Sequence, residues 1–212
     1  KNYRIHKFNS YSSSTPVTDA NHVVFTWTTK DSDILLCLDH NGNEKWQRDF
    51  GAFETQHGNG NSPIILGDLV IYPHDHFGKS RVYAIDLKTG KDVWVRDRNS
   101  AKPSHSTPCV YRSANGKERL IFTSDAHGIY ALNPENGAEL WESGPKTFDK
   151  RCVLSPVLVK GKILGTCGSG GGGNYIVAVT PPTSGKGQPK LEYTIRKAAP
   201  YVPTSVAHQG LL

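Results

Sequence analysis

Half of the side chains in this 212-residue sequence that could bind a metal or a ligand are histidines, and the others are amides, carboxylates and one arginine. The densest group is the run His74-Asp75-His76, and imidazole and carboxylate are two of the donor types that hold zinc. No further protein ligand outside this run is defined, so the sequence predicts no metal site. The candidate binding residues for a protein or small-molecule ligand are His57, Asn59, Asn61, His74, Asp75, His76, His105, Asp125, His127 and Arg151.

A glycine-rich run at residues 168–173, GSGGGG, has the spacing of the GxGxxG pattern that binds dinucleotide phosphates. That pattern needs a preceding strand and a following helix, whose N-terminus faces the phosphate. Here NYIVAV follows the glycines and has the composition of a strand. The run therefore indicates a loop between two strands rather than a nucleotide-binding site.

The elements that must position these side chains repeat along the chain. The stretches LCLDHNGNEKW, YAIDLKTGKDVW and YALNPENGAELW end at Trp46, Trp94 and Trp141. The tryptophans are 48 and 47 residues apart, and self-similarity at a fixed period of this size indicates a repeat architecture.

Each repeat has the pattern of four short strands joined by tight turns. In the second repeat the apolar runs SPIIL, LVIYP, RVYAID and KDVWVRD are separated by turn-forming residues. Four-stranded antiparallel sheets repeated at this period are typical of a β-propeller. We therefore expect an all-β fold, with one propeller segment over residues 1–212, blades at about 14–57, 58–102, 103–150 and 151–199, and partial blades at both ends.

Four repeats do not close such a propeller, and an open arc would leave apolar blade faces uncovered. We expect this chain to belong to a longer one, in a ring of about seven or eight blades completed by the remaining blades or by a partner chain. The segments NYRIHKF at the start, LEYTI at 191–195 and SVAHQGLL at the end are expected to be strands.

In a propeller, the loop that enters the first strand of a blade and the loop between its second and third strands lie on the same face. All ten candidate binding residues fall in these two kinds of loop. We therefore expect them to gather on one face near the central channel. For any single histidine, the alternative is that loops simply tolerate polar side chains.

The pattern Ala84-x-Asp86-x-x-Thr89-Gly90-x-x-x-Trp94 resembles the tryptophan-docking motif of the pyrroloquinoline-quinone-type, or quinoprotein-like, propeller repeats. That family includes quinoprotein alcohol dehydrogenases and the propeller lipoprotein of the outer-membrane β-barrel assembly machinery. The resemblance extends over four repeats, and it implies that the recurring tryptophan packs between blades without touching a cofactor. The residues that match the docking frame are Trp46, Ala84, Gly90, Trp94, Ala131, Gly137 and Trp141.

The resemblance leaves more than one function open. Quinoprotein dehydrogenases carry adjacent cysteines joined in a disulfide, calcium ligands and a catalytic aspartate, whereas no two cysteines are adjacent here. We therefore expect a non-catalytic binding or assembly scaffold without a cofactor. The resemblance also implies a location in the periplasm or otherwise outside the cytoplasm. One alternative is a pyrroloquinoline-quinone-dependent dehydrogenase whose quinone and calcium lie in blades absent from this chain. Another is a sensor or ligand-binding module of a larger protein.

Charge and cysteine content limit the remaining classes. The chain carries 25 Lys and Arg against 19 Asp and Glu, but the basic residues are scattered, which is typical of a solvated surface rather than a nucleic-acid site. No apolar run approaches the roughly 20 residues of a membrane-spanning helix. The four cysteines suit small core positions, and the alternative is a disulfide between Cys152 and Cys167 across a hairpin that turns at Lys160-Gly161.

Overall fold

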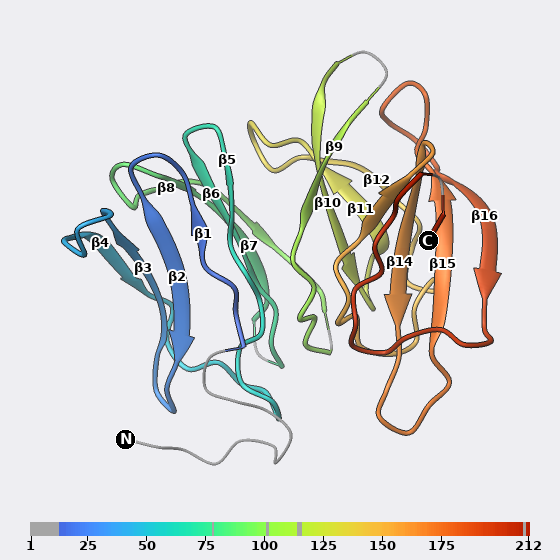
Figure 1. The fold of residues 1–212 in the computed structure, drawn as a ribbon, viewed down its shortest axis with the longest axis horizontal. Helices are drawn as coiled ribbons and strands as arrows, with labels where there is room; N and C mark the ends of the chain where they lie inside the picture. The colour runs from blue at the N-terminus through green and yellow to red at the C-terminus, as the bar shows by residue number, and fades with distance from the viewer. Residues whose placement is uncertain (1–12, 78, 101, 114–115, 210) are drawn as a thin grey trace. The chain divides into compact units, whose positions relative to one another are not determined.

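A computed structural model of the protein describes residues 13–77, 79–100, 102–113, 116–209 and 211–212 (Figure 1). These residues form four antiparallel sheets of four strands each, which confirms the predicted all-β class and the predicted four-stranded blades. In the described ranges no helix has the length and hydrophobicity needed to span a membrane. The chain divides after Asn99 into two compact units with two sheets each.

The strands of every sheet follow one another in chain order. The sheets of the first unit are β1 (Val17–Thr18), β2 (Val23–Thr28), β3 (Asp33–Leu38) and β4 (Glu44–Asp49), then β5 (Ile64–Leu66), β6 (Leu69–His74), β7 (Arg81–Asp86) and β8 (Asp92–Asp97). The sheets of the second unit are β9 (Cys109–Arg112), β10 (Glu118–Ser124), β11 (Gly128–Leu132) and β12 (Glu139–Glu142), then β13 (Val157–Val159), β14 (Lys162–Cys167), β15 (Tyr175–Thr180) and β16 (Lys190–Ile195).

The turn between the third and fourth strands is built by local side chains. In the β7–β8 turn, Asp86 Oδ1 accepts hydrogen bonds from the backbone N and the Oγ1 of Thr89, both at 2.7 Å. Gly90 follows with a φ of +71°, a conformation that glycine adopts without steric cost. The aspartate and the glycine together close the turn and set the direction of β8.

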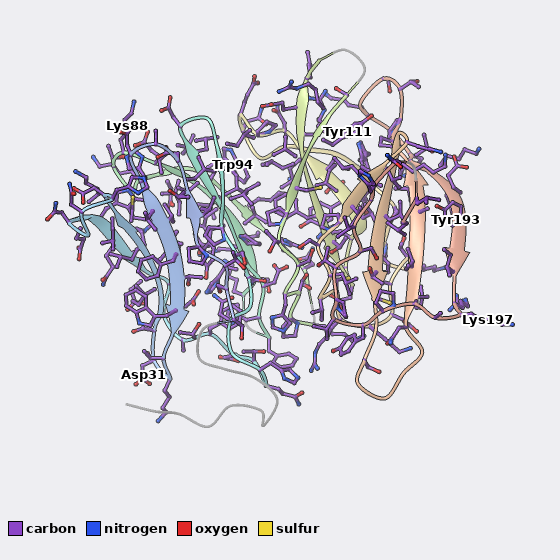
Figure 2. All side chains as sticks on the ribbon, in the orientation of Figure 1. Asp31, Lys88, Trp94, Tyr111, Tyr193 and Lys197 are labelled. Atoms are coloured by element: carbon purple, nitrogen blue, oxygen red, sulfur yellow. The ribbon has the colours of Figure 1, made fainter. Side chains whose placement is uncertain are left out.

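The pairing between the third and fourth strands is shifted by a bulge in every sheet. Just before the shift, a small residue lies opposite a large aromatic one: Cys37 opposite Trp46, Ala84 opposite Trp94, Ala131 opposite Trp141 and Ala178 opposite Tyr193. The three tryptophans are buried, whereas Tyr193 is 42% exposed. Figure 2 labels Trp94 and Tyr193. Tyr193 therefore takes the tryptophan position in the fourth sheet.

In the first unit, the core lies between the sheets β1–β4 and β5–β8. Trp46 packs with Val70, Tyr72 and Ile85 of the second sheet, and its Nε1 donates a 2.8 Å hydrogen bond to the backbone oxygen of Leu87. The ring also lies directly over Gly90, where an added Cβ would be 2.8 Å from the ring atoms Cγ and Cδ2. The tryptophan of one sheet thus joins the turn of the next.

The core of the second unit is built in the same way. Trp141 belongs to a buried cluster that also includes Ile129, Ile163 and Val177, from both sheets of that unit. Cys152 and Cys167 belong to the same cluster, and neither forms a disulfide, so the alternative of a disulfide between them is wrong. The Cys167 thiol instead lies 3.8 Å from Asp149 Oδ1.

The predicted strands at the ends of the chain have different outcomes. LEYTI is a strand, within β16, as predicted. SVAHQGLL is not: its described part forms an isolated bridge between His208 and Leu211, closed by two backbone hydrogen bonds of 3.1 and 2.9 Å. The strand prediction failed because Gln209 takes a positive φ of 47°, which turns the chain back on itself. NYRIHKF lies outside the described residues.

Gly90→Ala should destabilise the protein more than Gly42→Ala, although both glycines occupy the turn before the fourth strand with positive φ. Gly42 has no atom within 4 Å of an added Cβ, so its replacement costs only the conformational strain, about 1–2 kcal/mol. At Gly90 the clash with Trp46 adds about 1–3 kcal/mol. Urea unfolding of both variants measures the difference, and equal losses would contradict the packing of Trp46 on this turn.

Candidate functional site

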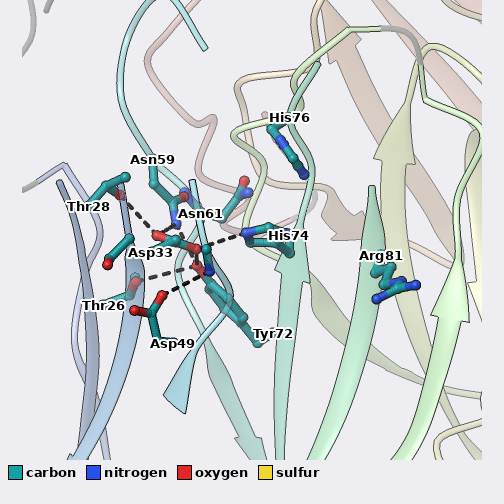
Figure 3. Close-up of polar contacts among 12 residues, drawn as sticks. Thr26, Thr28, Asp33, Asp49, Asn59, Asn61, Tyr72, His74, His76 and Arg81 are labelled. Carbon is teal, nitrogen blue, oxygen red and sulfur yellow. Dashed lines mark hydrogen bonds and ion pairs between the residues drawn. The ribbon is translucent and has the colours of Figure 1, made fainter. Parts of the chain in front are cut away.

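A buried polar cluster in the first unit brings together several of the predicted binding residues (Figure 3). Its centre is Asp33, the first residue of β3, whose side chain is fully buried. Asp33 Oδ1 accepts hydrogen bonds from Thr28 Oγ1 at 2.9 Å and from Asn59 Nδ2 at 2.8 Å. Burying a carboxylate is costly unless donors surround it, so these contacts are what allow Asp33 to lie inside the protein.

Tyr72 of β6 connects the second sheet to this carboxylate. Its hydroxyl donates to Asp33 Oδ2 and accepts from Asn59 Nδ2, and Thr26 Oγ1 lies 3.3 Å away. Burial, and then the charge of Asp33, raise the pKa of Tyr72 well above its ordinary value. The phenol therefore remains protonated and acts as a permanent hydrogen-bond donor to Asp33.

Asn59 and Asn61 differ sharply, although both come from the loop before β5 and both are buried. The Asn59 amide donates to Asp33 and Tyr72, and its Oδ1 accepts a 2.8 Å hydrogen bond from the backbone N of Asn61. Among the described residues, the side-chain amide of Asn61 has no hydrogen-bond partner. Asn59 is thus the residue that attaches this loop to both sheets.

The run His74-Asp75-His76 does not form one donor set. His74 Nε2 lies 3.1 Å from Asp33 Oδ2, whereas Asp75 Oδ2 lies 3.0 Å from a guanidinium nitrogen of Arg98. Both members of the Asp75–Arg98 pair are almost completely buried. The imidazole of His76 lies beside that of His74, with ring centroids 4.6 Å apart. Asp75 and His74 therefore contact different partners, Arg98 and Asp33.

His76 packs against the loop that follows β4. Its ring stacks on Phe53 with centroids 5.2 Å apart, and its Nδ1 accepts a hydrogen bond from the backbone N of Glu54 at 3.3 Å. Burial lowers the pKa of His76, and the neighbouring imidazole of His74 lowers it further. The neutral ring is therefore the form that the folded protein favours.

The predicted residues of the second unit are also held by contacts within the fold. The backbone N of His105 donates to Cys152 O at 2.8 Å, and Arg151 forms an isolated bridge with Gly168. Asp125 Oδ1 accepts a 2.6 Å hydrogen bond from Ser100 Oγ, and His127 Nδ1 lies 2.6 Å from Glu142 Oε2. Of the ten candidate residues, five are buried and five are half-buried.

Sequence reasoning missed Asp33, Tyr72 and Arg98, which organise the cluster in the first unit. Asp33 follows a polar turn and Tyr72 lies inside an apolar strand, so neither stands out from the repeat. The signal that could have identified Asp33 is its place at the first position of a buried strand, where an aspartate needs partners. Arg98 follows the last residue of β8 and carries no comparable signal.

The first unit also has an open groove of about 560 Å³ that the sequence analysis did not predict. Its lining includes two ion pairs, Arg48–Asp92 and Arg81–Asp97, each with a shortest nitrogen–oxygen distance of 2.8 Å. These charges make the groove polar. Its other lining residues are Asp49, Phe50, Tyr83 and Val95.

Comparison with known proteins identifies the family. Residues 6–192 match the family described as outer membrane protein assembly factor BamB, and the chain belongs to this family. A quinoprotein ethanol dehydrogenase from Pseudomonas putida is 34% identical over 137 residues, which are 59% of this chain and 21% of that enzyme. The chain therefore spans about one fifth of the length of the curated relatives it matches.

Two solved structures share the fold. BamB from Moraxella catarrhalis superposes with a TM-score of 0.52 at 17% identity, over 78% of this chain and 45% of that one. The quinohemoprotein alcohol dehydrogenase ADHIIG from Pseudomonas putida HK5 superposes with a TM-score of 0.56 at 16% identity, over 92% of this chain and 35% of that one. At these identities the likeness concerns the fold alone, and it confirms the predicted β-propeller.

Asn59→Ala should destabilise the protein by about 2–3 kcal/mol, because it removes donors from a buried carboxylate and a buried phenol. Asn61→Ala is the matched control: it truncates an equally buried amide of the same loop that makes no such contacts. Chemical denaturation should show that Asn61→Ala costs at least about 1 kcal/mol less. The reverse order would mean that Asn59 does not anchor the loop.

Acidification should weaken the folded state through His76. In the unfolded chain its pKa is near 6.5, and in the folded protein it is lower. Between these two values the unfolded state binds more protons, so the free energy of unfolding falls as the pH decreases through 6.5. Urea midpoints of the wild type and His76→Gln at about pH 7.5 and pH 5 test this, since the variant should lose less stability on acidification. Equal losses in the two proteins would contradict the assignment.

Proposed function

We propose that this chain is a non-catalytic segment of a quinoprotein-like propeller that serves as a binding or assembly scaffold for a protein or small-molecule ligand. The observation that carries the proposal is the match of residues 6–192 to the outer membrane protein assembly factor family. A propeller suits this role because its packed sheets hold loops of variable sequence in fixed places.

The contacts of the loop side chains support a role without catalysis. His74 contacts Asp33 and Asp75 pairs with Arg98, so these polar groups stabilise the fold. In the glycine-rich loop, Asn174 Oδ1 accepts a 3.0 Å hydrogen bond from the backbone N of Ser169, an arrangement that closes the loop on itself. We expect ligand contacts from the half-buried loop residues instead, which are His57, His105, Asp125, His127 and Arg151.

The alternative, a pyrroloquinoline-quinone-dependent dehydrogenase, is favoured by the 34% identity to a quinoprotein ethanol dehydrogenase. Cofactor sites are concave and mostly apolar. The groove of the first unit is open and lined by ion pairs, so its residues do not fit a flat quinone. Under this alternative, the quinone and calcium would be held by blades outside this chain.

Partly exposed apolar faces in the described part of the chain support the proposal that further blades or a partner chain complete the ring. On β2, Val23, Phe25 and Trp27 lie opposite Leu38, Leu36 and Ile34 of β3, which puts six apolar side chains on one sheet face. Five of these six are only half-buried. On β16, Tyr193 and Ile195 are 42% and 39% exposed. In sheets that have a neighbour, faces of this kind are covered by it.

A location outside the cytoplasm, in the periplasm, is part of this proposal. Its support is the family description, which names outer membrane protein assembly.

The scaffold and the dehydrogenase make opposite predictions for the full-length protein. The test places a photo-crosslinking residue either at position 57 or at position 88. His57 lies in the loop before β5 and Lys88 in the β7–β8 turn, at opposite ends of the β5–β8 sheet. In cells, the scaffold should give a discrete protein adduct from position 57 and much less from position 88. The purified protein, given pyrroloquinoline quinone, calcium and an alcohol, should not reduce an artificial electron-accepting dye. Quinone-dependent dye reduction would establish the alternative.

A further inference from the structure

The bulge between β11 and β12 places two carboxylates on the same face of the sheet. Glu142 pairs with Tyr130 and Glu139 pairs with Leu132, while Trp141 pairs with Ala131 between them. Paired residues of neighbouring strands share a face, and faces alternate along β11. Without the bulge, residues 139 and 142 would point to opposite faces. With it, both glutamates lie on the face opposite to Trp141.

His127 is held beside these glutamates by its own turn. Its backbone oxygen accepts a 3.1 Å hydrogen bond from Gly144 N, and an added Cβ at Gly128 would lie 2.3 Å from Ser143 Oγ. The turn is therefore packed against the chain that follows β12. The imidazole Nδ1 lies 2.6 Å from Glu142 Oε2, and the donor atoms of His127, Glu139 and Glu142 all lie within 4.8 Å of one another.

The other three sheets carry the same bulge but not the same donors. The residues that correspond to Glu139 and Glu142 are Glu44 and Gln47 in the first sheet, Asp92 and Val95 in the second, and Leu191 and Thr194 in the fourth. A pair of carboxylates is therefore not something that the blade needs in order to fold. Only the third sheet combines two carboxylates at these positions, and in that sheet a histidine from the neighbouring turn joins them.

We propose that His127, Glu139 and Glu142 form a binding site for a divalent transition cation such as Zn²⁺. One imidazole and two carboxylates are a donor set that zinc accepts, with ligand distances of about 2.0–2.2 Å. Donors around one ion at these distances are at most about 4.4 Å apart, so small side-chain rotations suffice to close the site. Three protein ligands leave at least one coordination position for water or for a ligand atom from a partner.

The site is tested by equilibrium binding of Zn²⁺ alone to the untagged, chelator-treated protein, with Mg²⁺ as the comparison ion. Glu139→Gln and His127→Asn each remove one donor and should weaken the strongest Zn²⁺ site at least about tenfold. Glu135→Gln is the matched control, because Glu135 is an exposed glutamate in the turn of the same sheet. It should leave the binding curve unchanged.

A second measurement identifies which of the nine histidines respond. Nitrogen-15 NMR of the imidazoles should show a zinc-induced shift of Nδ1 of His127 at the first equivalent of metal. Identical binding curves for the wild type, Glu139→Gln and His127→Asn would overturn the proposal. So would a first equivalent of zinc that shifts only other histidines.

Discussion

A four-stranded sheet with two apolar faces cannot cover both of them by itself, and within each unit of this protein the two sheets bury apolar side chains against one another. The clearest example is the contact of Trp46 with the β7–β8 turn. Its ring lies on Gly90, and its indole Nε1 donates a hydrogen bond to the backbone oxygen of Leu87. Other features of the repeat follow from it. The residue paired with the tryptophan is small, the bulge begins beside that pair, and the glycine of the next blade has no side chain because the ring takes its place.

Packing sheets face to face also decides what the loops can do. The loop before β5 crosses from one sheet to the next, and its polar groups must find partners inside the protein. Asp33 provides one, since Thr28, Asn59 and Tyr72 all direct hydrogen bonds to its carboxylate. Removing a single donor from such a network leaves the others around an under-satisfied charge. This explains why predicted binding residues such as Asn59 and His74 lie inside the protein.

The part of the structure that could be predicted from the sequence is the part that repeats. The period of the tryptophans and the composition of the turns were enough to predict the four sheets. The Asp33 cluster could not be predicted, because it joins residues distant in sequence that share no spacing. LEYTI was predicted as a strand, but Tyr193 was not predicted to take the tryptophan position of the fourth sheet. The end of the chain was misread because SVAHQGLL has apolar residues but turns at Gln209.

Differences between repeats are therefore more informative about function than the features they share. The tryptophan, the small residue opposite it and the bulge recur because every sheet must pack on another, and they would be present whatever the protein bound. Glu139 and Glu142 occupy positions where the other sheets hold at most one acidic residue, and packing alone does not account for them. The same argument applies to the Asp75–Arg98 pair, which a sheet does not require but which fixes the loop after β6. Packing between sheets does not constrain such positions, so their residues can vary. At these positions one propeller can differ from another in what it binds.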